Sequence, residues 1–104
     1  MAARVRITVL KRTLNADFLA ECATHTWEPC DAFSESKEFI VERDAHMPPG
    51  FCSWAWCDIH KYALTLARGG NFSGSRPAVT VACCSDGYRP VLFALERVGP
   101  AEAE

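Results

Sequence analysis

Six cysteines are the residues of this 104-residue chain that could most readily do chemistry. They stand at Cys22, Cys30, Cys52, Cys57, Cys83 and Cys84. An even count in a short chain would suit a secreted disulfide scaffold, but such domains usually lack the apolar patterning of this sequence. The opening segment MAARVRITVLKR has no apolar signal core. We therefore expect reduced thiols and a cytoplasmic protein.

Cys52 is the first candidate for a reactive thiol, because it precedes the longest helical pattern in the chain. Free N–H groups and the positive end of the dipole at a helix start favour a thiolate, the form that is nucleophilic and binds metals. The preceding Pro48-Pro49-Gly50-Phe51 segment would fix the direction of the chain. The alternative interpretation is a small residue at a tight junction between loop and helix.

Cys83 and Cys84 are adjacent on an expected strand, so their side chains should point to opposite faces. Cys83 is in phase with Val79 and Val81, and we predict that it is a core residue. Cys84 is in phase with Thr80 at the strand end, and it is the better candidate for a functional site. A bulge or turn beginning at Cys83 would let both thiols face one ligand.

Cys30 lies in the loop segment EPCDAF, and loops often carry ligand-binding residues. Thiolates from Cys30, Cys52, Cys83 and Cys84 could together hold zinc, copper or an iron–sulfur centre. They could also act without metal, with Cys52 as the nucleophile and Cys84 or Cys30 as the resolving thiol. The sequence has no pair of short Cys or His knuckles and no Cys-x-x-Cys, so neither hypothesis has a strong motif behind it.

Cys57 and His60 share one face of the same expected helix, three residues apart, which is a spacing that can hold a metal. A single pair of this kind arises often by chance. A half-buried cysteine beside a flanking histidine is therefore the favoured interpretation.

Aromatic residues near the first candidate thiol could form the walls of a pocket for a flat ligand. Trp54 and Trp56 are two residues apart on the helix and must face different directions, so we expect Trp56 in the core and Trp54 beside a cleft. Asn71 and Arg89 could supply polar anchors, and the guanidinium of Arg89 suits a carboxylate. Arg89 could equally pair with Asp86 across a turn.

Hydrophobic alternation in the sequence predicts the strands that would position these residues. Residues 4–10 and 37–43 alternate between apolar and polar side chains, and we predict a strand at each. Residues 77–84 and 89–98 form two apolar runs joined by a segment that contains Asp-Gly, which predicts a hairpin.

Two helices complete the expected fold. A short helix is predicted over 16–23 with Asn15 as its cap, and a longer amphipathic helix over about 53–68, ended by Gly69-Gly70. The order β-α-β-α-β-β predicts an α+β fold, with a mostly antiparallel sheet of about four strands and two helices packed on one face.

Composition indicates one globular domain, since hydrophobic residues make up 49% of the chain and charged residues 23%. We place this domain at residues 1–98 and expect a disordered tail at 99–104. No apolar run approaches the ~18 residues of a membrane-spanning helix, so no membrane partner is expected.

Charge argues against nucleic-acid binding, because the chain carries 11 basic and 13 acidic residues and a net charge of −2. Nucleic-acid binders normally show a basic excess that neutralises phosphates. The one basic cluster, Arg4, Arg6, Lys11 and Arg12, is interpreted as the solvated face of a strand. We expect a small molecule or a metal ion as the partner.

Two long stretches carry a resemblance: GFCSWAWCDIHKYALTLARGGNF and VACCSDGYRPVLFALERV. They resemble an uncharacterised family of small bacterial cysteine-containing proteins. That family has a loop cysteine before its second strand, a Pro-Gly-x-Cys-x-Trp-Ala-Trp helix start, a Gly-Gly-Asn-Phe helix end and a Cys-Cys-x-Asp-Gly-x-Arg-Pro-Val hairpin.

The resemblance covers nearly the whole chain and implies a domain type more than a reaction. The positions that match the family's motifs are Cys30, Cys52, Trp54, Trp56, Asp58, Gly69, Gly70, Cys84 and Arg89. Cys22 and Cys57 are not part of the family pattern, which weakens the metal hypothesis for Cys57 and His60.

Three functional hypotheses remain open. The first is a thiol site, with or without a metal, at the start of the long helix. The second is a small enzyme or ligand-binding module of a biosynthetic pathway, with a Trp/Cys/Arg pocket. The third is a structural or partner-binding domain, marked by an exposed apolar patch around Trp27 and Phe33. The outer face of the strands would serve for a homodimer in all three.

Overall fold

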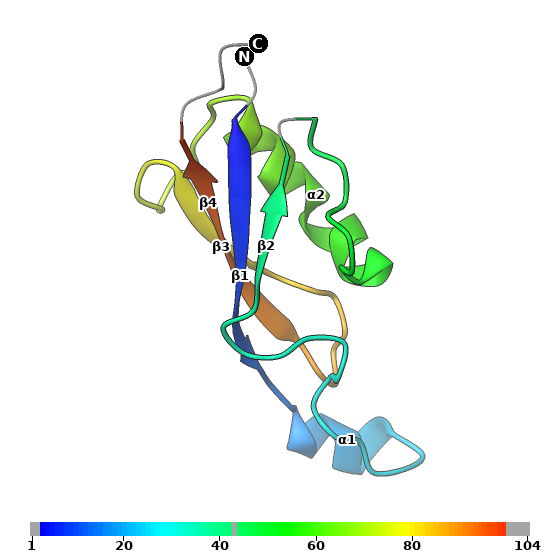
Figure 1. Cartoon of the computed structure of the whole chain (residues 1–104). Coiled ribbons are helices and arrows are strands. Elements are labelled where there is room, and N and C mark those ends of the chain that lie inside the picture. The colour runs from blue at the N-terminus through cyan, green and yellow to red at the C-terminus, as the bar shows by residue number, and fades with distance from the viewer. Residues whose placement is uncertain (1–2, 43, 100–104) are drawn as a thin grey trace.

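The computed structural model describes residues 3–42 and 44–99 of the chain. In this part it has one four-stranded sheet and two helices (Figure 1). In chain order they are β1 (Arg4–Arg12), α1 (Ala16–Cys22), β2 (Glu38–Val41), α2 (Ser53–Ala67), β3 (Val79–Cys83) and β4 (Val91–Val98). The expected α+β class and element order are confirmed.

The sheet has the strand order β2-β1-β4-β3, and every neighbouring pair is antiparallel. In the central pair, Ile7 of β1 lies opposite Leu95 of β4, and Val9 lies opposite Phe93. The alternating pattern puts the apolar side chains of these strands on one face. Those that are fully buried there are Val5, Ile7, Val9, Val41, Val91, Phe93 and Leu95.

Helix α2 covers this apolar face (Figure 1). Of the apolar stripe that the helical period predicts, Ala55, Ile59, Ala63 and Leu66 are at most 1% exposed, and Tyr62 is half-buried. Close packing of these residues on the strands makes one hydrophobic core.

The carboxyl end of α2 is closed by glycine, as the sequence predicts. Gly69 has a φ of 91°, which L side chains rarely adopt, and its N–H donates to the carbonyl of Leu66 at 3.0 Å. The Gly70 N–H donates to the carbonyl of Thr65 at 2.8 Å. These bonds satisfy carbonyls that the helix end would otherwise leave free.

Helix α1 differs from the expectation that both helices pack on the sheet. It lies beyond the end of the sheet, and none of its residues is buried (Figure 1). Asn15 stands at its N-cap without a side-chain cap bond, and its Nδ2 instead donates to the carbonyl of Gly87 at 2.7 Å. The expected side-chain cap is therefore wrong, and the Phe18 N–H of the first turn donates instead to Oδ1 of Asp17 at 3.0 Å.

The phase of β3 is opposite to the one predicted. Thr80 and Ala82 face the core, whereas Val81 is 56% exposed and Cys83 is also exposed. The prediction that Cys83 is a core residue is wrong. Small side chains face inward here because α2 packs directly against β3, and the hydroxyl of Thr80 is paired with that of Ser75 at 3.1 Å.

The expected domain boundary at residue 98 lies next to the end of the described residues. Gly99 is described, and residues 100–104 of the expected tail lie outside the described residues. Within the described ranges, no helix has the length and apolar character needed to cross a membrane.

Candidate functional site

Three cysteines that are distant in the sequence line one pocket of about 590 Å³. That volume lies within the range of roughly 300–1,000 Å³ typical of small-molecule sites. We call it the Cys52 pocket, and its lining consists of Cys30, Asp31, Ala32, Phe33, Cys52, Trp54, Ala55, Cys84, Ser85, Asp86, Gly87, Tyr88 and Arg89. The predicted meeting of the loop cysteine, the start of the long helix and the hairpin end is thus present in the structure.

A tight turn sets the position of Cys52. The Phe51 N–H donates to the carbonyl of Pro48 at 3.3 Å, and Gly50 has a φ of 80°. Proline followed by glycine suits this geometry, because proline fixes its own φ and glycine accepts a positive one. The turn delivers the chain directly to the start of α2.

Cys52 is the N-cap residue of α2. Its carbonyl accepts the N–H of Trp56 at 2.9 Å, while its thiol makes no cap bond to the helix. The N–H groups of the first helical turn have no acceptor within the helix, and they form the positive end of its dipole. The half-buried Cys52 therefore stands at the positive end of the helix dipole.

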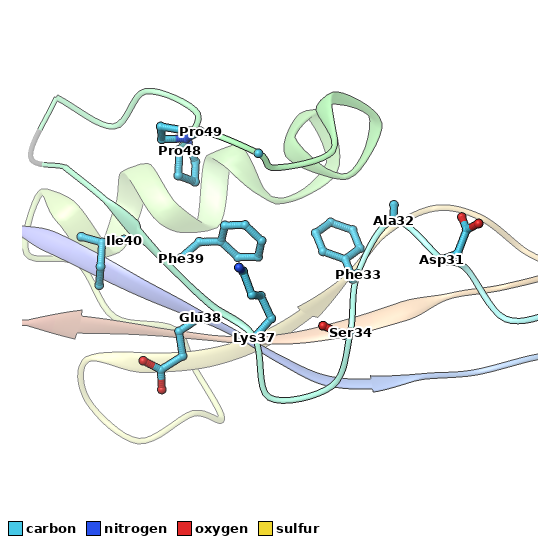
Figure 2. Close-up of a pocket in the computed structure, with 11 residues that line it drawn as sticks. Asp31, Ala32, Phe33, Ser34, Lys37, Glu38, Phe39, Ile40, Pro48 and Pro49 are labelled. Carbon is cyan, nitrogen blue, oxygen red and sulfur yellow. The ribbon is translucent and has the colours of Figure 1, made fainter.

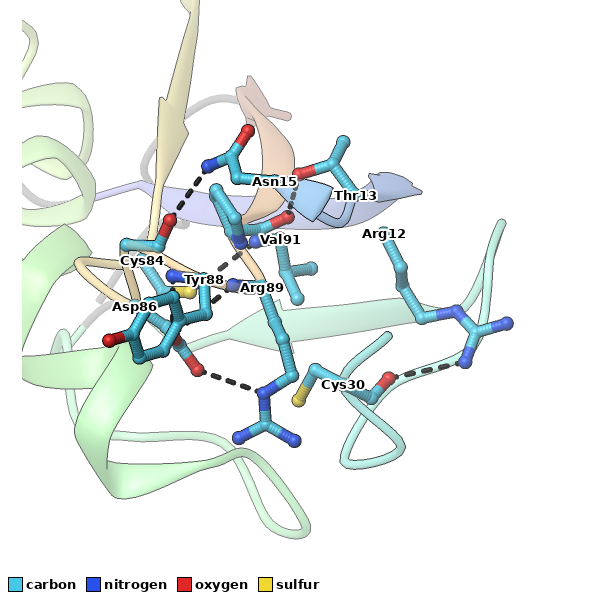
Figure 3. Close-up of polar contacts among 11 residues, drawn as sticks. Arg12, Thr13, Asn15, Cys30, Cys84, Asp86, Tyr88, Arg89 and Val91 are labelled. Atoms are coloured by element: carbon cyan, nitrogen blue, oxygen red, sulfur yellow. Dashed lines mark hydrogen bonds and ion pairs between the residues drawn. The ribbon is translucent and has the colours of Figure 1, made fainter. Parts of the chain in front are cut away.

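Cys30 is half-buried and packs against the edge of the core. Its carbonyl accepts a hydrogen bond of 3.1 Å from Nη1 of Arg12, which lies on β1 (Figure 3). Arg12 Nε also donates to both carboxylate oxygens of Glu35, at 3.1 and 3.0 Å. Arg12 thus ties the loop that carries Cys30 to the sheet at two points.

The Arg12–Glu35 contact makes a testable pH prediction. Hydrogen bonding from the Arg12 side chain holds the pKa of Glu35 below its ordinary value of 4.5, and the backbone N–H of Glu35 contributes in the same direction. Because the pKa is lowered in the folded state, this contact stabilises the fold above the ordinary pKa. That contribution is lost as the pH falls through the lowered value.

Arg12→Gln should therefore raise the pKa of Glu35 toward 4.5 in a carboxyl-carbon NMR titration. Arg6→Gln is the matched control, because Arg6 also lies on β1, pairs with Glu96 at 2.6 Å and does not contact Glu35. An unchanged Glu35 titration in Arg12→Gln would contradict this account of the loop.

Cys84 is the most enclosed of the three thiols, with 8% of the residue exposed. Its sulfur accepts the N–H of Val91 at 3.4 Å, and its own N–H donates to the carbonyl of Val91 at 3.1 Å. Cys84 and Val91 thus close the base of the hairpin loop. A buried sulfur that already has a donor suits a wall of the pocket better than an attacking group.

The hairpin loop over residues 85–89 is held from two other segments. Asp58 of α2 accepts the N–H of Ser85 at 2.7 Å. From the other side, the hydroxyl of Thr13 donates to the carbonyl of Pro90 at 2.6 Å (Figure 3). The loop is longer than a two-residue Asp-Gly turn, and Gly87 does not adopt a positive φ. The predicted hairpin is confirmed, with a wider turn.

Arg89 is the cation of the pocket, and two residues orient it. Its Nε donates to Oδ2 of Asp86 at 3.1 Å (Figure 3). Its Cζ lies 4.5 Å from the ring centroid of Trp27, a cation–π distance. The sequence offered two alternatives for Arg89, a pairing with Asp86 and a place in the pocket. The structure has both at once.

An aromatic cluster backs the pocket. Phe51 has ring contacts with Phe33, Phe39, Trp56 and Phe93 at centroid distances of 5.0, 4.9, 6.0 and 5.5 Å. Phe33 is 6% exposed and is shared by this cluster and the pocket wall.

The tryptophans divide as expected. Trp56 is partly buried and packs against the core cluster, and Trp54 is 68% exposed at the edge of the pocket. The exposed patch expected around Trp27 and Phe33 is absent, because Phe33 is buried and Trp27 is half-buried between other side chains.

Several candidate residues stay outside the pocket. Asn71 accepts hydrogen bonds from the Ala78 N–H at 2.8 Å and from Arg97 at 3.1 Å, and so it braces the segment before β3. Cys57 is exposed, and the ring of His60 lies 5.1 Å from that of Trp56.

The thiols show neither pairing nor a metal-type cluster. All six cysteines are free. Within residues 3–42 and 44–99, no group of three or more His, Cys, Asp or Glu side chains is placed to hold a metal ion. Cys83, one of the four candidate metal ligands, is exposed and does not line the pocket.

Sequence reasoning missed Phe33 and Tyr88 as pocket walls and Arg12 as the anchor of the Cys30 loop. The two aromatic residues carry no local signal, because they reach the pocket from irregular segments. Arg12 was assigned to a solvated strand face. Its position at the end of β1 was the available clue.

A second hollow of about 600 Å³ lies along the outer edge of β2. Figure 2 shows Phe33 and Phe39 beside it, between β2 and the segment with Pro48 and Pro49. Among the described residues, its lining includes no cysteine, histidine or arginine. It therefore offers fewer groups for chemistry than the Cys52 pocket.

Comparison with protein-family models, curated proteins and solved structures found no match for this chain. The resemblance to the small bacterial cysteine-containing family stays a prediction from the motifs.

Proposed function

We propose that this protein binds a small organic molecule in the Cys52 pocket and that the Cys52 thiol reacts with it. The observation that carries the proposal is the convergence of three thiols, from positions 30, 52 and 84, on one pocket that also contains Trp54 and Arg89. Such a pocket combines apolar walls with a few polar groups, which is the usual composition of small-molecule sites.

Cys52 is the thiol best placed to act as the nucleophile. It is half-buried at the amino end of a 15-residue helix, which is the positive end of the helix dipole. Cys84 is buried and its sulfur is already hydrogen-bonded. Cys30 is half-buried on the opposite loop and is the better second thiol.

The chemistry that suits two accessible thiols is exchange with a small disulfide. The Cys52 thiolate attacks one sulfur of the ligand, so a protein–ligand S–S bond forms and the other half leaves as a thiolate. Cys30 then attacks the Cys52 sulfur and releases the second half. Two protein thiols are oxidised to one disulfide, and one ligand disulfide is reduced to two thiols.

The proposal is tested by the alkylation rate of each cysteine with iodoacetamide, measured by mass spectrometry of quenched digests. We expect Cys52 to react about tenfold faster than Cys57, a difference of roughly 1.4 kcal/mol in activation free energy. Cys57 is the matched control, because it lies on the same helix, is exposed and does not line the pocket.

Equal rates at Cys52 and Cys57 would overturn the proposal. Zinc, copper and iron are measured in the same untagged preparation. A stoichiometric metal whose removal by a chelator is needed before Cys52 reacts would also overturn it, in favour of a metal centre.

A further inference from the structure

We propose that the molecule bound in the Cys52 pocket is a small organic acid whose carboxylate is held by Arg89. This inference rests on the proposed function and names the ligand class for it.

The guanidinium of Arg89 is already oriented before any ligand arrives. The hydrogen bond from Nε to Asp86 fixes one edge, and the ring of Trp27 lies against the group. The side chain is 27% exposed, so it lies at the surface of the pocket and not free in solvent. An arginine that is held in this way loses little conformational entropy on binding a ligand.

The other edge of the guanidinium is unused. Among residues 3–42 and 44–99, no group accepts a hydrogen bond from Nη1 or Nη2 of Arg89. These two nitrogens form a planar fork, and a carboxylate matches that fork with two parallel hydrogen bonds. The geometry thus leaves a carboxylate-binding edge of Arg89 in the pocket.

The charges around Arg89 allow an anion to bind there. Asp86 uses Oδ2 for Arg89 Nε and Oδ1 for the backbone N–H groups of Tyr88 and Arg89, at 3.0 and 3.2 Å. Its negative charge is therefore shared among three donors. Asp31 also lines the pocket, but it is exposed and screened by water. The start of α2 adds a positive field at the same pocket.

The rest of the lining indicates the remainder of the ligand. Phe33, Trp54 and Ala55 give the pocket apolar walls. A molecule with its acid at Arg89 and its apolar part against these walls would lie next to the start of α2, where Cys52 is the cap. The ligand class is therefore a compact organic acid with a group that a thiolate can attack.

The test compares iodoacetate with iodoacetamide. The two reagents are of nearly equal size, but iodoacetate carries a carboxylate where iodoacetamide carries a neutral amide. For each cysteine, the ratio of the two alkylation rates is measured. In each reaction the thiolate sulfur forms a bond to carbon, and iodide leaves with the electron pair. The iodoacetate-to-iodoacetamide ratio at Cys52 should exceed the ratio at Cys57 by about tenfold, the size expected for one charge-assisted hydrogen-bonded pair.

Arg89→Gln should reduce the ratio at Cys52 to that at Cys57. Arg76→Gln is the matched control, because it removes the same charge from an exposed position outside the pocket and should leave the ratio at Cys52 unchanged. A ratio at Cys52 equal to that at Cys57 in the wild type would overturn the carboxylate inference while leaving a reactive Cys52 intact.

An NMR titration keeps the inference testable if Cys52 reacts with neither reagent, which would overturn the proposed function alone. Benzoate should shift the Nε–H resonance of Arg89, and benzamide should not. An unmoved Arg89 signal at millimolar benzoate would overturn the carboxylate site.

Discussion

Phe51→Ala is expected to lower the free energy of unfolding by about 3–5 kcal/mol, the range for removing a buried phenylalanine from a packed core. Phe51 is 6% exposed, and its ring contacts four other aromatic rings. Alanine would leave a cavity between α2 and the sheet. Urea denaturation followed by circular dichroism measures the change.

Phe18→Ala is the matched control for this substitution. Phe18 lies on α1, is 52% exposed and has no described ring contact, so its loss should change the stability by no more than about 0.5 kcal/mol. Equal losses for the two variants would show that the aromatic cluster is not the centre of the core.

Phe51→Ala should also alter the Cys52 pocket. The substitution removes the aromatic ring of the residue just before Cys52, and this ring contacts that of Phe33 at a centroid distance of 5.0 Å. We therefore expect the advantage of Cys52 over Cys57 in iodoacetamide labelling to fall under conditions where the variant remains folded. An unchanged advantage would show that the turn alone positions Cys52.

Asp86→Ala is expected to release both the hairpin loop and Arg89. The carboxylate accepts from two backbone N–H groups and one guanidinium nitrogen, so its removal should cost about 1–3 kcal/mol of stability. Amide hydrogen exchange should become faster at Tyr88 and Arg89, the two residues whose N–H groups lose their acceptor. The preference of Cys52 for iodoacetate should fall toward that of Cys57.

Asp86→Asn separates the two parts of this effect. The asparagine carbonyl can still accept the backbone N–H groups, whereas the charge that orients Arg89 is gone. We expect slower exchange at Tyr88 than in the alanine variant, together with a reduced iodoacetate preference. Asp17→Ala is the control, since Asp17 is exposed and, in the described part of the chain, accepts from the neighbouring Phe18 N–H alone. Unchanged exchange at Tyr88 in Asp86→Ala would contradict the role given to this carboxylate.

Local patterns predicted the elements well where one face of an element is apolar. The stripe of α2 and the alternation of β1 both contain residues that must leave water, and each fits a single period. The same reasoning misassigned β3, where valines alternate with small residues. On this edge strand the valines at 79 and 81 lie on the outer face, because α2 approaches the small side chains of Thr80 and Ala82.

In the candidate site, too, local patterns predicted some residues and missed others. The start of α2 and the turn before it were readable from proline, glycine and cysteine in succession, because these residues restrict the backbone locally. Arg12 and Phe33 had no such signal. Their roles depend on contacts with Cys30 and Phe51, which are 18 residues away in each case.

The amino-acid sequence by itself determined the element order, the core-facing stripe of α2, the glycine that ends it and the placing of a cysteine at its amino end. These features follow from backbone preferences and hydrophobic periods within one element. Only the tertiary structure decided that Cys83 is exposed on the outer face of β3 and not buried in the core, that α1 lies apart from the sheet and that Asp86 and Trp27 orient Arg89. These features depend on which surfaces meet, and the long-range packing of α2 and the loops on the sheet sets that meeting.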